Sequence, residues 1–127
     1  MKALLSIKPQ FVEKIFSFEK KYEFRKAIFK REVDTVVIYS TMPEGKIVGE
    51  FRVEDVLCDN LEDIWEQTSQ FAGITYEYFK EYFNNKEEAY AIKIGEVIRY
   101  KTPIDPKLVD ASFVPPQSFC YTDKEYV

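Results

Sequence analysis

Apolar and polar residues near the start of the chain alternate with two different periods. Residues 3–7 form a short apolar run that stops just before Pro9, and proline is favoured at the first position of a helix. Apolar side chains then recur at helical spacing as far as Phe18, and strict alternation follows over residues 20–26. The pattern therefore predicts a strand, a helix that ends near Phe18, and a half-buried strand.

Two longer strands are predicted in the middle of the chain. Residues 34–40 form a second apolar run, and residues 42–45 (Met-Pro-Glu-Gly) supply turn chemistry before the next segment. Residues 46–57 then alternate, which places Ile47 and Phe51 on the same face. We expect this segment to be a long, bent strand.

Helical spacing returns after Asn60, which is a good N-cap residue for a helix over residues 61–71. Thr75 can cap a third helix, whose aromatic side chains at i, i+1, i+4 and i+5 are typical of core packing rather than of base stacking. Residues 88–100 alternate again as the last long strand, and a proline-punctuated, extended tail follows. The aromatic residues of the third helix are Tyr78, Phe79, Tyr82 and Phe83.

These elements together predict an α+β, mostly β fold. About five to six strands with two or three helices in one short chain favour a small mixed sheet curled into a barrel. We expect residues 1–127 to form a single domain. The alternation predicts five apolar side chains that point into the barrel, namely Tyr22, Phe24, Phe51, Ile92 and Ile94.

Composition narrows the class of protein. The chain has 127 residues, of which 46% are hydrophobic and 31% charged, enough for one core without a disordered region. Its longest apolar runs are far shorter than the roughly 20 residues that cross a bilayer. We therefore expect a cytoplasmic protein with no membrane contact. Two widely separated cysteines and the absence of histidine argue against a zinc site, a disulfide framework or His-based catalysis, so we expect no metal and no cofactor.

Charge is distributed unevenly along the chain. Residues 1–52 carry eleven Lys or Arg against seven Asp or Glu, a balance of +4, whereas residues 53–127 carry seven against fifteen, a balance of −8. A basic face on an acidic protein can still attract phosphate, because salt screens each charge beyond about 8–10 Å. An ordinary solvated surface is the alternative interpretation of the same charges.

Several segments resemble the ASCH domain family. The opening residues 5–15 and 19–26 are similar to the start of ASCH domains, Gly45–Phe51 to their central strand and Ala89–Ile94 to a late strand. Residues 115–119 (Pro-Pro-Gln-Ser-Phe) also resemble the closing run of prokaryotic members. The likeness covers nearly the whole chain.

This resemblance implies a PUA-like pseudo-barrel with a cleft bordered by the first helix, the strand that follows it and neighbouring loops. PUA-like folds are usually associated with RNA, and ASCH domains are proposed to bind RNA or nucleotides. Because fold analogy alone does not establish function, the residues that would border such a cleft have to be weighed one by one.

Four charged residues could bind RNA or a nucleotide. Lys8 comes just before the first helix, where free backbone N–H groups and the helix dipole favour an anion. Glu23 and Arg25 share one strand face, and Arg can hold a phosphate or base edge while Glu accepts from an exocyclic amine. Lys20 precedes them. The alternatives are a surface lysine at position 8 and an exposed salt-bridge ladder on the strand.

Polar groups in two further segments could line a cleft. Tyr39, Ser40 and Thr41 end the second apolar run with three hydroxyl groups, and Gln117 and Ser118 offer similar chemistry in the tail. Ser and Thr at strand ends also commonly satisfy the backbone of a turn.

The resemblance raises an enzymatic alternative as well. Some ASCH proteins are small amidohydrolases of N4-acetylcytidine that use a lysine, a threonine and a glutamate. Lys20 falls where their catalytic lysine would be, but Glu23 stands at the threonine nucleophile position. Phe18 also replaces a glycine that is common in the family. Lys20 and Glu23 are thus the only candidate catalytic residues, and we lean against catalysis.

Three functions remain open from the sequence. The first is an RNA- or nucleotide-binding protein, with regulation of transcription or translation as one role. The second is a small hydrolase or nuclease acting on modified nucleosides or RNA, in which Glu23 serves as acid, base or metal ligand. The third is a protein-interaction module that meets a basic partner through acidic helices within residues 54–88.

Overall fold

A single six-stranded sheet organises the protein. The computed structural model describes residues 1–126, and the strands lie in the order β2-β5-β4-β3-β1-β6. The elements in chain order are β1 (Lys2–Ile7), α1 (Pro9–Phe16), β2 (Tyr22–Arg25), β3 (Thr35–Ser40), β4 (Lys46–Asn60), α2 (Leu61–Thr68), the 3-10 turn η1 (Ser69–Phe71), α3 (Tyr76–Tyr82), β5 (Glu88–Ile104), α4 (Pro106–Val109) and β6 (Phe119–Thr122).

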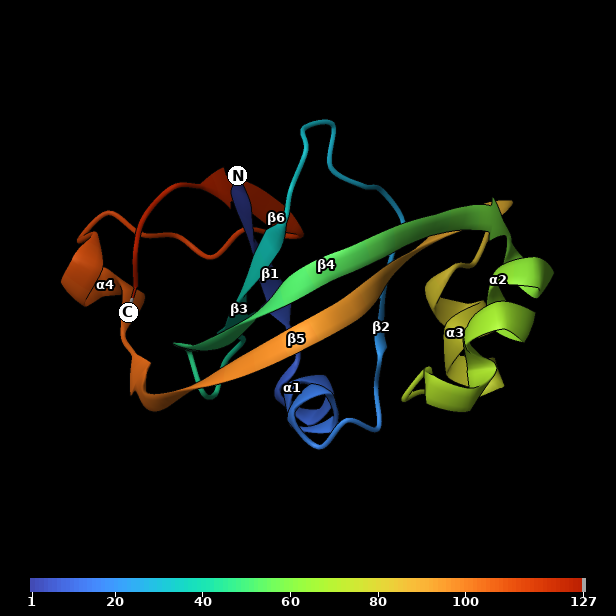
Figure 1. Cartoon of the computed structure of the whole chain (residues 1–127), viewed down its shortest axis with the longest axis horizontal. Coiled ribbons are helices and arrows are strands. Elements are labelled where there is room, and N and C mark those ends of the chain that lie inside the picture. The colour runs from blue at the N-terminus through green and yellow to red at the C-terminus, as the bar shows by residue number, and fades with distance from the viewer. Residues whose placement is uncertain (127) are drawn as a thin grey trace.

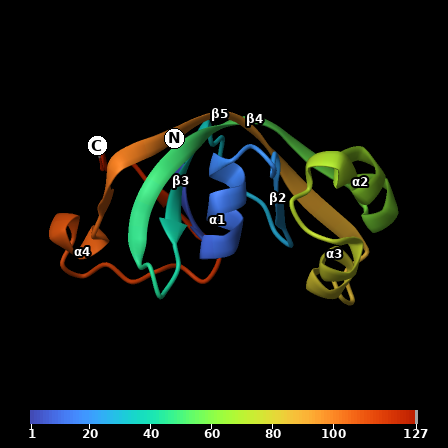
Figure 2. The same cartoon turned by 90° about the horizontal axis from the view of Figure 1, so that it is seen from below.

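The sheet is mixed and strongly curved. β1 pairs in parallel with β3, and the remaining neighbours are antiparallel. The two long strands β4 and β5 cross the whole molecule (Figure 1). Seen at right angles, they form an arch with α1 on its concave side, α2 and α3 at one end and α4 at the other (Figure 2).

The local signals for helix starts are confirmed. Pro9 occupies the first turn of α1. The side chain of Asn60 accepts a hydrogen bond from the Asp63 backbone N–H at the start of α2, and Thr75 accepts one from the Tyr78 N–H at the start of α3.

The largest hydrophobic cluster lies on the concave face, beneath α1. Val12 and Ile15 of α1 pack there against Leu5, Ile38 and Phe51 of the sheet, and all five are at most 2% exposed. Burying side chains of this size contributes about 1.5–3 kcal/mol each, so this contact holds α1 against the arch.

Two smaller clusters cover the opposite face of the sheet. Phe79 and Phe83 of α3 and Ile64 of α2 pack against one end. Leu4 and Val37 lie at the other end, where Phe113 of the C-terminal segment packs on them. The sheet therefore separates a concave core from two outer cores.

The predicted orientation of β2 is wrong. Phe51, Ile92 and Ile94 point into the concave core as predicted, but Phe24 and the partly buried Tyr22 belong to the outer cluster beneath α2 and α3. The alternation itself is correct, and the helices simply cover the apolar face of β2 from the outside.

The predicted alternation of β4 fails near its start. Ile47 and Phe51 were expected to share a face, yet Ile47 lies in the outer cluster with Leu4 while Phe51 lies in the concave core. A register shift in the β3–β4 ladder between Ile38 and Tyr39 inserts one extra residue, and such a bulge moves the residues beyond it to the opposite face.

Other differences concern element boundaries. The helix predicted over 61–71 ends at Thr68 and continues as η1, and residues 54–60 belong to β4 rather than to an acidic helix. The short elements α4 and β6 were not predicted. No helix among residues 1–126 is long and apolar enough to cross a membrane.

Candidate functional site

A pocket of about 480 Å³ opens where α1, β2, α3 and the C-terminal segment meet. Six of the nine predicted binding residues, which come from separate segments of the sequence, line it together. They are Lys8, Lys20, Glu23, Arg25, Gln117 and Ser118. The remaining lining residues are Ser6, Ile7, Phe11, Phe24, Lys26, Ala27, Ile74, Tyr78 and Tyr82.

A row of buried charges forms one wall of this pocket. The Glu23 carboxylate accepts a hydrogen bond from Arg25, with Oε2 and Nη2 2.8 Å apart, and its Oε1 lies 3.9 Å from the Lys20 Nζ. Glu23 lies directly opposite Ile92 in the ladder with β5, so its side chain points to the concave side. All three charged side chains are at most 10% exposed, so the exposed-ladder alternative is wrong for this pair.

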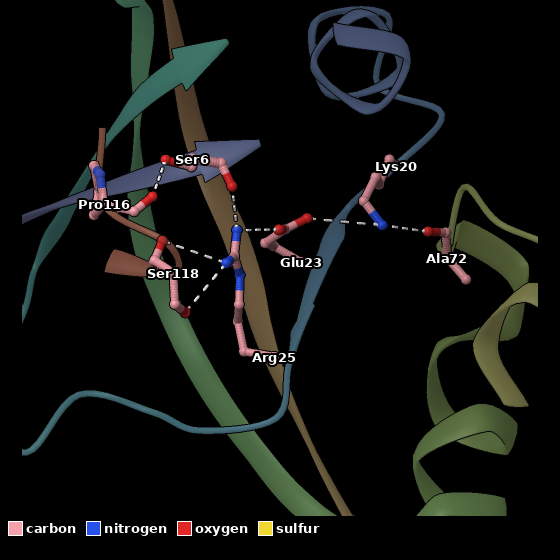
Figure 3. Close-up of polar contacts among 7 residues, drawn as sticks. All are labelled: Ser6, Lys20, Glu23, Arg25, Ala72, Pro116 and Ser118. Atoms are coloured by element: carbon pink, nitrogen blue, oxygen red, sulfur yellow. Dashed lines mark hydrogen bonds and ion pairs between the residues drawn. The ribbon is translucent and has the colours of Figure 1, made fainter. Parts of the chain in front are cut away.

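Arg25 connects the two edges of the curved sheet. Its Nη2 donates to the Ser6 backbone oxygen of β1 at 2.9 Å, and its Nη1 donates to the Ser118 backbone and side-chain oxygens, both at 3.4 Å (Figure 3). Ser6 Oγ in turn donates to the Pro116 oxygen at 2.7 Å. One guanidinium thus joins β2 to β1 and to the segment that forms the far wall of the pocket.

Lys20 lies at the other end of the charged row. Its Nζ donates to the Ala72 carbonyl oxygen at 2.9 Å (Figure 3). The same Nζ sits 4.8 Å from the centre of the Phe24 ring. Burial lowers the pKa of Lys20 from 10.5 to about 8, with Glu23 acting in the opposite direction. A fraction of this amine is therefore neutral near physiological pH, which a general base or nucleophile requires.

The loop after η1 covers Lys20 from outside. Gly73 has a φ of +69°, and a Cβ atom there would come within 2.6 Å of the Lys20 Cβ. The Lys14 Nζ of α1 donates to the Gly73 carbonyl oxygen at 3.1 Å, which ties the loop to α1. Glycine is thus required at position 73 both for the backbone conformation and for the space that the lysine stem occupies.

Exposed cations and aromatic rings surround the pocket mouth. Lys8 is exposed, and its Nζ lies 3.4 Å from the Tyr78 hydroxyl. The exposed Lys26 has its Nζ 4.8 Å from the centre of the Tyr82 ring. Phe11 and Tyr78 meet edge to face, with ring centroids 5.3 Å apart. Cations beside partly exposed rings are the groups that hold a phosphate and stack a base.

The pocket has an excess of positive charge. Lys8, Lys20, Arg25 and Lys26 face a single carboxylate, that of Glu23, which gives four cations against one anion. Phosphate would meet the exposed Lys8 and Lys26 first, because Lys20 and Arg25 are buried and already hydrogen-bonded.

Three predicted site residues lie elsewhere. Tyr39 packs against Phe113 in an outer cluster, with ring centroids 5.5 Å apart, and Ser40 is fully buried. The Thr41 backbone accepts from Glu44 in the turn before β4. The expectation that Tyr39, Ser40 and Thr41 border the same cleft is therefore wrong. Tyr39 and Ser40 lie opposite Ser6 and Ile7 in the ladder, but the Tyr39 side chain packs in the outer cluster and none of the three lines the pocket.

Part of the aromatic wall of the pocket was not predicted from the sequence. The whole aromatic stripe of α3 was expected in the core, which is confirmed for Phe79 and Phe83, both fully buried. Tyr78 and Tyr82 instead line the pocket and are partly buried. The signal that could have separated them is the hydroxyl group, which favours a position at a polar boundary.

Within residues 1–126, no three Cys, Asp or Glu side chains form a group that could hold a metal ion. Glu23 is the only carboxylate among the residues that line the pocket, and Arg25 already holds it. The described residues that line the pocket offer one carboxylate, one buried amine and further cationic groups.

Comparisons with known proteins identify relatives across most of the chain. The family model for the ASCH domain matches residues 5–98. An ASCH domain-containing ribonuclease of Zymomonas mobilis is 28% identical over 130 residues, which covers 97% of this chain and 85% of that protein. ATP synthase subunit alpha of Ureaplasma parvum is 32% identical over 104 residues, but these are only 13% of that protein.

Solved structures agree with the fold. The crystal structure of ASCH from Zymomonas mobilis matches with a TM-score of 0.89 and 27% identity, covering 97% of this chain and 88% of that one. The prediction of a small PUA-like α+β fold is confirmed.

Proposed function

This chain belongs to the ASCH domain family, and on that premise we propose that it binds single-stranded RNA or a nucleotide in the pocket between α1 and β2. The observation that carries the proposal is the meeting of four cations and three partly exposed aromatic rings around one cavity of about 480 Å³. The rings are Phe11, Tyr78 and Tyr82.

Each part of the pocket has a distinct role in this proposal. Lys8 and Lys26 at the mouth attract phosphate, and Tyr78 offers a ring face beside Lys8 on which a base stacks. The buried Arg25 and Glu23 hold the wall in shape rather than contact phosphate, because their hydrogen bonds are already directed at protein atoms.

A binding titration tests the proposal. A fluorescently labelled, mixed-sequence hexaribonucleotide is titrated with the protein at low salt, and anisotropy reports the affinity. Lys8→Ala and Lys26→Ala should each weaken binding about fivefold, since losing about 1 kcal/mol corresponds to that factor. Both side chains are exposed, so their removal should leave the fold intact.

Lys107→Ala is the matched control, because Lys107 is an exposed lysine on α4, outside the pocket. It should bind RNA as the parent does. Absence of binding at low salt, or equal affinity for all four proteins, would reject the proposal in favour of a protein-interaction role.

RNA cleavage is a second candidate function, favoured by the buried Lys20 amine beside Glu23 and by the name of the Zymomonas mobilis relative. A neutral lysine could remove the proton of a ribose 2′-hydroxyl, whose oxygen then attacks the adjacent phosphate as the bond from phosphorus to the 5′-oxygen of the next nucleotide breaks. This leaves a 2′,3′-cyclic phosphate, and the lysine ammonium returns its proton to the departing 5′-oxygen. The test follows cleavage of an end-labelled RNA by the parent and by Lys20→Met. Cleavage that persists unchanged in Lys20→Met would contradict this role.

A further inference from the structure

A second pocket, of about 530 Å³, lies on the other side of Lys20, which lines both cavities. We call it the Phe18 pocket. Its wall includes the aromatic residues Phe18 and Phe71, the lysines Lys21 and Lys93, and one carboxylate, Glu54. Of the residues that line it, only Lys20 also lines the first pocket.

Phe18 is held in an unusual conformation at the end of α1. Its φ of +65° is in the left-handed region, which is sterically disfavoured for every residue except glycine. Its N–H donates to the Ile15 oxygen and the next N–H to the Lys14 oxygen, the geometry of a helix end that glycine usually occupies. The residue is nevertheless 62% exposed, so core packing does not explain the choice of phenylalanine.

A second exposed ring stands in the same pocket with a cation already on it. The Lys21 Nζ lies 4.3 Å from the centre of the Phe71 ring, and the Lys21 N–H donates to the Phe71 oxygen at 2.8 Å. Lys93 adds another partly exposed ammonium, whose contact with Glu54 is loose at 3.9 Å. The pocket therefore presents two rings and two accessible lysines against one carboxylate.

We propose that the Phe18 pocket binds a further nucleotide of a single-stranded RNA whose other nucleotides occupy the first pocket and pass Lys14 between the two pockets. Phe18 or Phe71 stacks the base, and Lys21 and Lys93 face the phosphates. The inference rests on the proposed RNA-binding function and extends it from one nucleotide to a strand.

Charge and continuity favour RNA over a protein partner. Lysine is depleted in the centres of protein interfaces, whereas single-strand sites combine lysines with aromatic platforms. The segment from Phe71 to Ile74 runs from the second pocket to the first, and Lys14 lies against its middle. An RNA strand that follows this segment would pass Lys14, a third cation, between the two pockets.

Two RNA probes and four substitutions test this path. The probes are a labelled diribonucleotide, short enough for the first pocket alone, and a labelled hexaribonucleotide. Phe18→Gly removes the ring while supplying the residue that the backbone prefers, so its melting temperature should equal or exceed that of the parent. Any loss of binding then reports the ring rather than unfolding.

We expect Phe18→Gly to weaken hexaribonucleotide binding about tenfold and to leave diribonucleotide binding unchanged, since stacking on one ring is typically worth a factor of this order. Lys21→Gln should also weaken only the longer probe. Lys8→Ala should weaken both probes, because it alters the first pocket. Leu108→Ala, at an apolar residue that is 85% exposed on α4, is the matched control and should change neither.

The outcomes separate the two proposals. If Lys8→Ala weakens both probes while Phe18→Gly binds the hexaribonucleotide as the parent does, the first pocket binds RNA and the Phe18 pocket does not. If neither probe binds the parent, both proposals fail. If Phe18→Gly leaves RNA affinity intact but converts a dimer to a monomer in sedimentation, the exposed ring is a contact between copies of the chain, and the RNA path is wrong.

Discussion

Glu23 and Arg25, two residues apart on β2, form an ion pair on the concave side of the sheet, with Oε2 and Nη2 2.8 Å apart and both side chains about nine-tenths buried. Charged residues are rarely buried unless they are paired, and this pair also joins β2 to Ser6 and Ser118. The pair therefore connects the shape of the pocket to the stability of the fold.

Breaking this pair should destabilise the folded protein. Arg25→Ala should lower the free energy of unfolding by about 3–5 kcal/mol, because it leaves the Glu23 carboxylate buried without its partner. Urea denaturation measures the change. Lys93→Ala, which removes an exposed pair with Glu54, should cost at most about 1 kcal/mol. Equal effects of the two substitutions would show that the buried pair does not stabilise the fold.

The stability of the protein should rise with pH because of Lys20. Burial lowers its pKa to about 8 in the folded protein, against 10.5 for an unfolded chain. Below pH 8 both states hold the proton, so the cost of the buried charge is constant. Between pH 8 and 10.5 the unfolded state holds more protons, and the free energy of unfolding rises by up to about 3 kcal/mol.

The parent and Lys20→Met should be compared by denaturation across that range, because tyrosines that also titrate at high pH contribute equally to both. As the pH rises, the free energy of unfolding of the parent should increase relative to that of Lys20→Met. A constant difference from pH 7 to 10.5 would mean that the pKa of Lys20 is not lowered.

Gly73→Ala should destabilise the loop that covers Lys20. The φ of +69° costs a non-glycine residue about 1–2 kcal/mol, and the new Cβ would press on the Lys20 stem at 2.6 Å. Together these effects should lower the free energy of unfolding by about 2–4 kcal/mol. Gly95→Ala is the control, because its Cβ would meet its nearest neighbour, the Arg52 oxygen, at 3.3 Å. A loss at Gly73 no larger than at Gly95 would contradict the packing argument.

RNA binding should weaken with salt. Each phosphate contact contributes about −0.7 to the slope of log affinity against log salt for a single strand, so about three contacts give a slope near −2. Lys8→Ala should reduce the magnitude of the slope by about 0.7, whereas Lys107→Ala should leave it unchanged. The titrations span about 50 to 200 mM salt, and a flat response would rule out phosphate recognition.

We predict no appreciable hydrolysis of N4-acetylcytidine. The polar partners of the Lys20 Nζ are the Glu23 carboxylate and the Ala72 carbonyl oxygen, and neither is a hydroxyl nucleophile. The assay incubates the purified protein with the nucleoside and follows release of cytidine. Turnover of about 1 per second or faster would overturn the argument.

Local patterns in the sequence were sufficient for the longer elements and for the family. Asn60 and Thr75 cap their helices through bonds that reach only three residues, and Pro9 starts α1 through its own fixed φ. The same closeness explains why Lys20, Glu23 and Arg25 could be predicted together, since they share one short segment of the chain.

Tertiary structure alone decided which side of each element is buried and what meets across the sheet. Alternation along β2 predicts two faces, but it does not show which of them lies on the concave side of the sheet. That depends on α2 and α3, which pack on Phe24 from the outside. The bulge near Ile47 and the packing of Tyr39 in an outer cluster likewise depend on how β3 and β4 pair and on what covers the sheet. The approach of Ser118 to Arg25 spans 93 residues, and no local pattern encodes a contact that forms only when the sheet curves and brings its two edges together.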